Sequence, residues 1–429
     1  MPNCCFLSET SRMLEIHRAL RDRGAPVRVA THGGPHEQAL RDAGVAYDRI
    51  GPAMSRERCE RLVQSVPGIG PVDQSVWSDE ELRAYTAAEA AYFRAHDVRV
   101  AVTGWTLTAL LSTRLVGIPL VTEHAGSFLP PLMERGLLPA PTRPVGLPLE
   151  RWLPQRLRRL LFNAGVQRMT HYTAGFNRVA AELGVEGVPG LAALLVSDLS
   201  LVTDVPEVLG LARSDVDGWR PRKPRHYRSG TRLRYTGPLF AHLAIPTPAD
   251  VDEFLRRPGP VVYVAVTSSS VGLVREIVGA LRPLGVRILV AATVHDLADL
   301  ADEQVHVAGV LPSHEIMPRV ALAVTAAGHG SVQTALASGT PLIGVPLQPE
   351  QDANIALAER TGAARCVPLA QAGGPVLTRT ARELLADPRA RAAAARMREV
   401  FAQVDGAAGA AEAICELLDE VRGAAAVSA

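Results

Sequence analysis

A glycine-rich turn followed by a hydroxyl side chain is the pattern in this chain best suited to binding a phosphate. Gly328, His329, Gly330 and Ser331 follow the apolar run at 322–325, which predicts a strand, a turn and the start of a helix. The first N–H groups of a helix lack partners within it, and its dipole is positive there. We therefore predict a phosphate site, although Gly-x-Gly is also an ordinary tight turn.

Two histidines follow predicted strands and could exchange protons with a ligand. His32 lies in Thr-His-Gly-Gly and His124 in Thr-Glu-His-Ala-Gly. Ligands of open α/β sheets bind beside the carboxyl ends of the strands, and imidazole titrates near neutral pH. Each histidine is a candidate catalytic or acceptor-binding group, with a capped or surface loop histidine as the alternative.

Two carboxylate pairs match the Asp-x-Asp pattern of metal sites, Asp215-Val-Asp217 and Asp250-Val-Asp252. Neither follows a strand of the predicted nucleotide domain, so we expect no metal. The only lysine, Lys223, excludes a Walker A loop and Schiff-base chemistry, which need a positioned ammonium group. The 5 cysteines are odd in number and lack metal spacing, so we predict neither a disulfide framework nor a zinc site, and a cytoplasmic location.

Length and charge limit the class of protein. The 429 residues suggest two domains, and 47% hydrophobic residues can build large cores. The chain has 45 basic and 44 acidic residues. Its net charge is therefore close to zero and creates no overall electrostatic field that would favour binding of nucleic acid. The N-terminal residues do not resemble a signal peptide, and no apolar stretch is long enough to span a membrane.

Apolar runs alternate with helical stretches, which is typical of the α/β class with parallel sheets. An arginine- and proline-rich stretch around Lys223 interrupts this alternation and suggests a linker. The predicted strands lie at 4–7, 27–30, 98–102, 119–121, 260–266, 286–291, 305–307, 322–325 and 342–345, with helices at 13–23, 107–116, 271–284 and from 330. The predicted domains are 1–225 for an acceptor, a linker at 226–240, 241–400 for a donor, and a C-terminal helix at 401–429 that can cross back to the first domain.

The segment 324–365 resembles the donor-binding signature of the UDP-glycosyltransferase superfamily, particularly of bacterial members that glycosylate natural products. The resemblance extends to 260–268, 307–313 and 235–238, and it implies a GT-B fold, with two Rossmann-like doubly wound domains facing each other across a cleft. The positions that carry the signature are Gly328, Gly330, Ser331, Ala335, Leu336, Gly339, Pro341, Pro346, Glu350, Gln351 and Asn354.

The resemblance also implies the roles of individual residues in donor binding. Hydroxyl and N–H groups suit a diphosphate, and a carboxylate beside an amide suits sugar hydroxyls. The implied contacts are Ser268, Gly328, Gly330 and Ser331 to the diphosphate, Val310, Leu311 and Ser313 to the base, and Glu350 and Gln351 to the sugar.

Several family positions carry other residues here. The phosphate-contacting histidine is replaced by Ala326, the ribose-binding glutamate by Thr334, and a glycine after the first donor strand by Thr267. His329 is one candidate replacement on the phosphate turn. These changes imply altered or weaker donor binding.

The general-base histidine of the family aligns with Glu9 and its orienting aspartate with Thr103. A carboxylate can act alone if burial raises its pKa, so the candidate bases are Glu9, His124 and His32, with Glu9 slightly ahead. The alternative for Glu9 is an acidic residue that favours the dipole of the first helix.

We therefore predict inverting, metal-independent transfer of a hexose, without a cofactor, from a nucleotide-diphosphate sugar (UDP or dTDP) to a small hydroxylated acceptor in bacterial natural-product biosynthesis. The alternative is a non-catalytic homologue that activates a partner glycosyltransferase, because the base dyad is missing. A dinucleotide oxidoreductase fits less well, since Gln333 occupies the position of its third small residue.

A basic amphipathic helix is predicted after the proline-rich stretch at 130–154. We expect a solvated face that covers the cleft and no membrane contact, with a membrane surface or an acceptor pocket as alternatives. The sequence leaves open whether the chain forms a homodimer. The helix carries Arg151, Arg156, Arg158 and Arg159, interleaved with Trp152, Leu153, Leu157 and Leu160.

Overall fold

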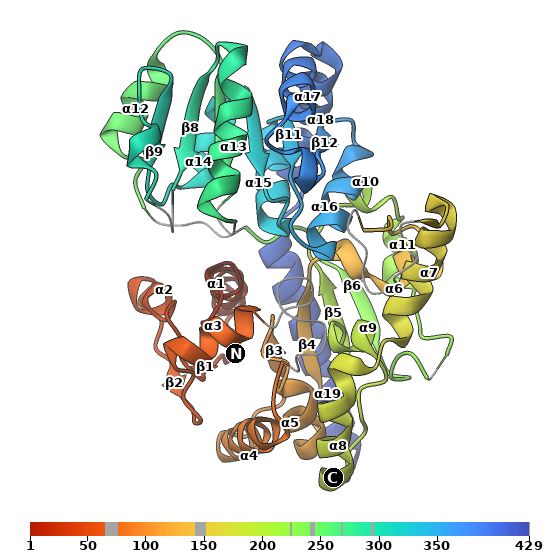
Figure 1. The fold of residues 1–429 in the computed structure, drawn as a ribbon. Helices are drawn as coiled ribbons and strands as arrows, with labels where there is room; N and C mark the ends of the chain where they lie inside the picture. The colour runs from red at the N-terminus through yellow and green to blue at the C-terminus, as the bar shows by residue number, and fades with distance from the viewer. Residues whose placement is uncertain are drawn as a thin grey trace. The chain divides into compact units, whose positions relative to one another are not determined.

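The computed structural model describes residues 1–64, 76–141, 152–223, 225–240, 245–266, 269–292 and 296–428. The chain folds as two compact units (Figure 1). The first comprises Met1–Ala140, Gly146–Ala241 and Asp405–Ala429, and the second contains His242–Val404. Parallel strands alternate with helices in each unit, so the predicted α/β class with two doubly wound units is confirmed.

The second unit is built on a six-stranded parallel sheet of order β12-β11-β10-β7-β8-β9. From β7 the chain adds β8 and β9 on one side, then returns to place β10 on the other side. This reversal makes the carboxyl ends of β7 and β10 a topological switch point, where α/β sheets bind ligands. The strands are β7 (Val261–Ala265), β8 (Arg287–Ala291), β9 (Val305–Ala308), β10 (Leu322–Thr325), β11 (Leu342–Gly344) and β12 (Ala364–Cys366).

Aliphatic residues of these strands are buried against the helices in one continuous core. The inner strands β7, β10 and β11 are nearly continuous apolar runs because both faces of a parallel sheet are covered, and the predicted strands of this unit are confirmed. The helices are α12 (Ala249–Arg256), α13 (Val271–Leu281), α14 (Ser313–Ile316), α15 (His329–Ser338), α16 (Pro349–Glu359), α17 (Pro375–Ala386) and α18 (Pro388–Ala402).

The first unit has a four-stranded parallel sheet of order β3-β4-β5-β6 and a separate parallel pair, β1 and β2. Its strands are β1 (Ala30–Thr31), β2 (Asp48–Arg49), β3 (Ala101–Thr103), β4 (Leu120–His124), β5 (Leu199–Val202) and β6 (Arg232–Tyr235). Its helices are α1 (Leu7–Asp22), α2 (Gln38–Asp42), α3 (Arg56–Gln64), α4 (Asp79–Ala95), α5 (Ala109–Val116), α6 (Pro130–Glu134), α7 (Gln155–Arg168), α8 (Ala174–Leu183), α9 (Leu191–Leu194), α10 (Pro206–Leu209), α11 (Arg213–Asp217) and α19 (Gly406–Ser428).

Two predictions for the first unit are wrong. The strand expected at 4–7 is absent, because α1 already begins at Leu7. The linker expected at 226–240 contains β6, which completes the sheet with Leu233 and Tyr235 buried. Arg232 and Arg234 alternate with these residues and form ion pairs with glutamates of α19, so a basic stretch that suggests a linker in fact forms an edge strand.

The C-terminal helix α19 belongs to the first unit. Its apolar residues Ala410, Ile414 and Leu417 share a core with Ile16 and Leu20 of α1. No helix among the described residues is long and apolar enough to cross a lipid bilayer.

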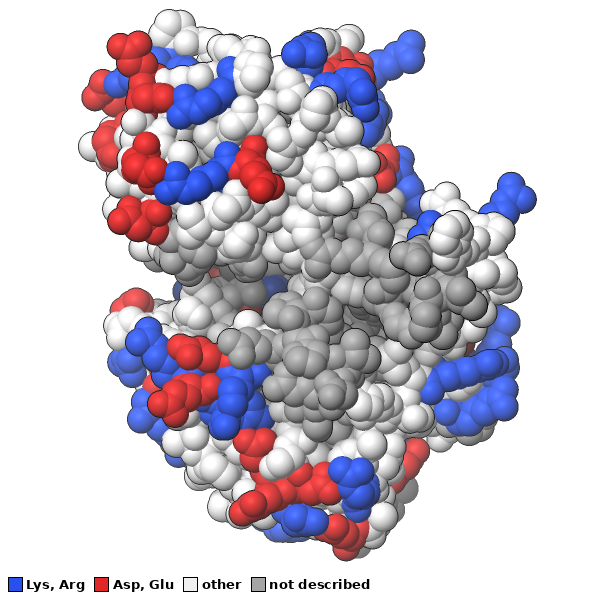
Figure 2. All heavy atoms as spheres, in the orientation of Figure 1, with Lys and Arg blue, Asp and Glu red and all other residues white. Residues whose placement is uncertain are grey.

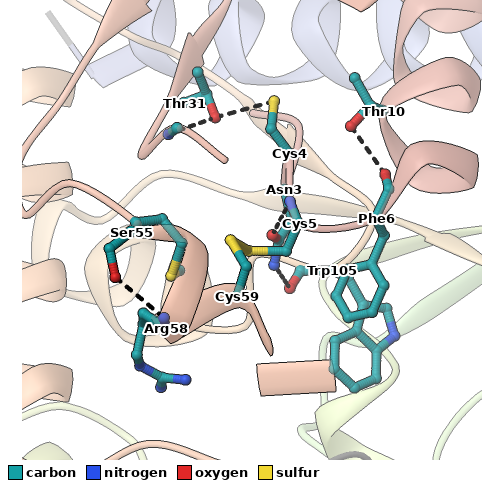
Figure 3. Close-up of a disulfide and its surroundings, with 12 residues drawn as sticks. Asn3, Cys4, Cys5, Phe6, Thr10, Thr31, Ser55, Arg58, Cys59 and Trp105 are labelled. Atoms are coloured by element: carbon teal, nitrogen blue, oxygen red, sulfur yellow. Dashed lines mark hydrogen bonds between the residues drawn. A yellow bond between two sulfur atoms is a disulfide. The ribbon is translucent and has the colours of Figure 1, made fainter. Parts of the chain in front are cut away.

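A disulfide joins Cys5 to Cys59 of α3 (Figure 3), which corrects the expectation of no disulfide. The two residues are 54 positions apart, and their Cα atoms lie 5.1 Å from each other. Sequence spacing does not reveal such a pairing, because it depends on how α3 is placed beside the N-terminal residues. Of the other cysteines, Cys4 is buried, and burial raises the pKa of its thiol to about 11.

Candidate functional site

The predicted phosphate turn lies at the switch point of the second unit. β10 pairs with β7 up to Thr325, and the chain then turns through Ala326 and Ala327 to Gly328, the N-cap of α15. The first N–H groups of α15 therefore lie at the carboxyl edge of the sheet, as an anion site requires. The predicted contact Ser268 and its neighbour Thr267 lie outside the described residues.

Open space lies beside both glycines of this turn. Among the described residues, a Cβ atom added to Gly328 or Gly330 would meet no atom within 4 Å outside its immediate chain neighbours. At Gly344, in contrast, a Cβ atom would lie 2.6 Å from Ile355 Cγ1, so the packing of the protein itself explains that glycine. Nothing in the described structure requires Gly328 and Gly330 to be glycine, which is consistent with close approach of a ligand.

One residue of the same turn has an unfavourable backbone conformation. Ala327 has a φ of 59°, a left-handed conformation that side chains other than glycine and asparagine rarely adopt. Its N–H donates to Thr325 Oγ1 at 3.0 Å, and its carbonyl accepts from Asn354 Nδ2 at 3.1 Å. The turn is thus held in shape from β10 and from α16.

Asn354 connects the phosphate turn to the predicted sugar contact. Its Nδ2 also donates to Glu350 Oε1 at 2.6 Å, one helical turn earlier in α16. Gln351 is buried, and its Oε1 accepts from the Leu347 N–H at 2.7 Å. This hydrogen bond fixes which end of the side-chain amide is the acceptor, and the Nε2 group is the end that can donate. The sequence prediction did not include Asn354 among the site residues, although its spacing of four from Glu350 places both on one helix face.

The remaining predicted diphosphate and ribose residues lie in the first two turns of α15. His329 is its first residue and is buried, while Ser331 is half-buried. Thr334 donates from Oγ1 to the Gly330 carbonyl at 2.7 Å. The hydroxyl group of Thr334 is therefore bonded to the backbone of its own helix.

The predicted base pocket follows β9, at the same edge of the sheet. Val310 is 47% exposed and can pack against a planar ring, but Leu311 is 5% exposed and belongs to the interior. Ser313 Oγ lies 3.0 Å from Tyr263 Oη of β7, and burial raises the pKa of that phenol to about 12. Tyr263, which the sequence prediction missed, ties this loop to the switch-point strand.

Glu9 is enclosed in the first unit rather than open to a ligand. It is 2% exposed. Its Oε1 accepts the N–H groups of Gly104 and Trp105 at 3.0 and 3.1 Å, and its Oε2 accepts that of Asn3 at 2.7 Å. Burial raises the pKa of Glu9, against these hydrogen bonds. Because both oxygens hold backbone groups, the geometry assigns Glu9 an anchoring role beside the end of β3.

His32 is likewise engaged on both ring nitrogens. Nδ1 lies 3.2 Å from the Pro52 carbonyl, and Nε2 lies 3.0 Å from Glu89 Oε1. The carbonyl can only accept, so Nδ1 is the donor in that contact, and Nε2 is within hydrogen-bond distance of the carboxylate. Glu89 also accepts from Thr108 and Ser112. His32 has no lone pair left for a substrate in this arrangement.

We expect Glu89→Ala to destabilise the protein by about 3 kcal/mol, because three buried donors would lose their acceptor. At about 2–4 °C per kcal/mol this lowers the melting temperature by about 6–12 °C. Glu80→Ala, on the exposed surface of the same helix, is the control and should shift it by less than about 2 °C. Equal melting temperatures for the two variants in calorimetry would contradict this network.

His124 ends β4 at the carboxyl edge of the sheet and is 4% exposed. Its carbonyl accepts from the Thr203 N–H at 3.1 Å. The preceding Glu123 forms a buried ion pair with Arg12 of α1 at 3.0 Å and accepts from Thr203 Oγ1. The sequence prediction did not include Arg12 and Glu123; the signal was a carboxylate directly before the candidate His124.

The Asp-x-Asp carboxylates are engaged in contacts within their own units. Asp215 forms an ion pair with Arg135, and Asp217 accepts from the Tyr235 N–H. Asp250 contacts His306, and Asp252 contacts Arg319. Across the described ranges, no group of three His, Cys, Asp or Glu side chains is arranged to hold a metal ion.

Residues 290–412 match the glycosyltransferase family 28 C-terminal domain. The chain is 24% identical over 330 residues to a PGL/p-HBAD biosynthesis glycosyltransferase of Mycobacterium tuberculosis, covering 76% of this chain and 72% of the relative. It is 30% identical over 190 residues to 4'-demethylrebeccamycin synthase of Lentzea aerocolonigenes, covering 42% and 44%. The structure of the glycosyltransferase VinC in complex with dTDP superimposes with a TM-score of 0.65 at 17% identity, covering 98% of this chain and 100% of VinC. The match covers both units and confirms the GT-B fold class.

Proposed function

We propose that the chain is a member of the UDP-glycosyltransferase superfamily, to which its similarities point, and that it transfers a sugar, with inversion, from a nucleotide-diphosphate sugar to a hydroxylated natural-product or glycolipid acceptor. The observation that carries the proposal is the glycine turn at the switch point, where the N terminus of α15 meets open space beside Gly328 and Gly330. The similarity to VinC, which was solved with dTDP, supports dTDP or UDP as the nucleotide.

In the proposed reaction a base on the first unit removes the acceptor hydroxyl proton. The oxygen bonds to the anomeric carbon from the face opposite the diphosphate, and the carbon–phosphate oxygen bond breaks. The departing diphosphate carries the negative charge to the N–H groups around Gly328 and Ser331. We propose His124 as the base, because it ends β4 at the carboxyl edge of the sheet, where open α/β sheets bind ligands.

The alternative of a non-catalytic activating homologue has no support from the relatives, which are themselves described as glycosyltransferases. The predicted sugar contacts Glu350 and Gln351 are also oriented by internal hydrogen bonds. A pure scaffold would have no use for such orientation.

A thermal-shift series with UDP, dTDP and GDP, and with their sugars, tests the donor assignment. A ligand at about 100 times its dissociation constant stabilises a protein by about 2.7 kcal/mol, so the matching nucleotide should raise the melting temperature by about 5–10 °C. If every saturating nucleotide and nucleotide sugar leaves the melting temperature unchanged, the donor assignment is wrong.

We expect turnover to persist in EDTA, because the helix terminus rather than a cation stabilises the leaving diphosphate. Product formation from the matching donor, followed by mass spectrometry, checks this. Collapse of activity with chelator and its return with magnesium or manganese would show that a metal takes part.

A further inference from the structure

An unusual apolar patch covers the outer side of α7 in the first unit. Of the five large hydrophobic side chains that are exposed among the described residues, four lie on or just before this helix. They are Trp152, Leu157, Leu160 and Leu161, exposed by 73%, 40%, 62% and 42%. Single exposed hydrophobic residues are common, but a group of four on one element points to a partner.

The three leucines lie on one face of the helix. Leu160 and Leu161 follow Leu157 by three and four positions, which brings them side by side. Asn163 and Val166, by contrast, are buried. Asn163 Nδ2 donates to the Leu138 carbonyl at 2.9 Å, and Phe162 contacts Phe128. α7 therefore packs on the first unit through one face and presents an apolar stripe on the other.

Arginines border this stripe. At about 100° per residue, Arg156 and Arg158 lie on the two sides of Leu157. The segment Gln155–Arg168 contains four arginines and no acidic residue. Blue side chains project at the right-hand edge of Figure 2, where Figure 1 places α7. Leucine and tryptophan bordered by arginine form the surface of a helix that lies in the plane of a membrane interface.

We propose that this face of α7 docks the protein onto an anionic lipid surface, with Trp152 and the leucines in the interface and the arginines on lipid phosphates. The positive charge beside the leucines favours an anionic lipid surface over a second copy of the chain. A second copy of the chain meeting the same face by two-fold symmetry would bring the two sets of arginines together without a carboxylate from either helix. Guanidinium groups bind phosphate well. This proposal replaces the expectation of a merely solvated face and does not depend on sugar transfer.

Vesicle co-sedimentation of the full chain tests the proposal. The wild type should sediment with vesicles of phosphatidylcholine and phosphatidylglycerol, bind phosphatidylcholine alone more weakly, and release as salt is raised. Leu160→Ser/Leu161→Ser should lower partitioning at least about tenfold, whereas Leu160→Met/Leu161→Met should retain it. Arg156→Ala/Arg158→Ala should lower binding to the anionic vesicles by about tenfold, whereas Arg156→Lys/Arg158→Lys should retain most of it.

The matched control is Arg379→Ala/Arg382→Ala, which removes two exposed arginines from α17 and should bind vesicles as the wild type does. Melting temperatures establish that each variant is folded. The proposal is overturned if the wild type binds neither vesicle, or if the leucine-to-serine variant binds as well as the wild type. A dimer in analytical ultracentrifugation that the same variant dissolves would also overturn it, by assigning the face to a second copy of the chain.

Discussion

His124→Ala is expected to lower the turnover number about 100- to 10,000-fold at saturating donor and acceptor, the usual cost of removing a general base. His124 ends β4 at the edge of the sheet where α/β proteins bind ligands. The proposed donor residues lie in the second unit, so nucleotide binding should be unchanged. Steady-state rates and a nucleotide thermal shift, measured on the same preparation, check both halves of this expectation.

Glu9→Gln is the matched comparison. The amide preserves size but has one acceptor oxygen, so it cannot hold the N–H groups of Asn3, Gly104 and Trp105 as the carboxylate does. It should lower the melting temperature while turnover of the folded fraction falls much less. The opposite result, an active His124→Ala and an inactive but stable Glu9→Gln, would identify Glu9 as the base. If both variants turn over normally, the acceptor ionises without either.

Gly330→Val is expected to abolish the nucleotide thermal shift. A branched side chain would enter the space beside the first turn of α15, where the phosphate has to approach. The protein itself should tolerate the change, because in the described part of the chain no atom outside the immediate neighbours lies within 4 Å of the added Cβ and valine has a higher helix propensity than glycine. The melting temperature without ligand should therefore match or slightly exceed that of the wild type.

Gly344→Val provides the contrast. Its Cβ atom would lie 2.6 Å from Ile355 Cγ1 and 2.9 Å from Ala327 Cβ, so this variant should lose stability by steric overlap. Gly330→Ala, with a smaller side chain, should weaken nucleotide binding by less than valine does. A Gly330→Val protein that still shows the full nucleotide shift would place the phosphate elsewhere.

The second unit could be predicted from the sequence nearly strand by strand. Runs such as Val261–Ala265 and Leu322–Thr325 are buried on both faces, so they are almost entirely apolar and easy to recognise. β6 escaped recognition because it is an edge strand. Its arginines face α19, a helix about 180 residues away in sequence, and no local pattern records that contact.

In the candidate site, too, some features follow from local sequence and others from contacts between distant residues. Residue types at one turn indicated the phosphate site, since glycines before a helix determine where N–H groups point. The roles of Glu9 and His32 were decided by neighbours distant in the chain: Gly104 for Glu9, and Glu89 for His32. A buried side chain accepts or donates according to what the fold places beside it, and spacing in the sequence does not contain that information.

By itself, then, the sequence determined the α/β class, the positions of most strands and the glycine turn before α15, because these depend on local periodicity and backbone freedom. Only the tertiary structure decided that Cys5 meets Cys59, that α19 returns to the first unit, that Asn354 holds both Ala327 and Glu350, and that α7 carries its leucines outward. Each of these depends on which surfaces become neighbours when the chain folds. That choice is made by packing over the whole unit, and no segment of the chain specifies it alone.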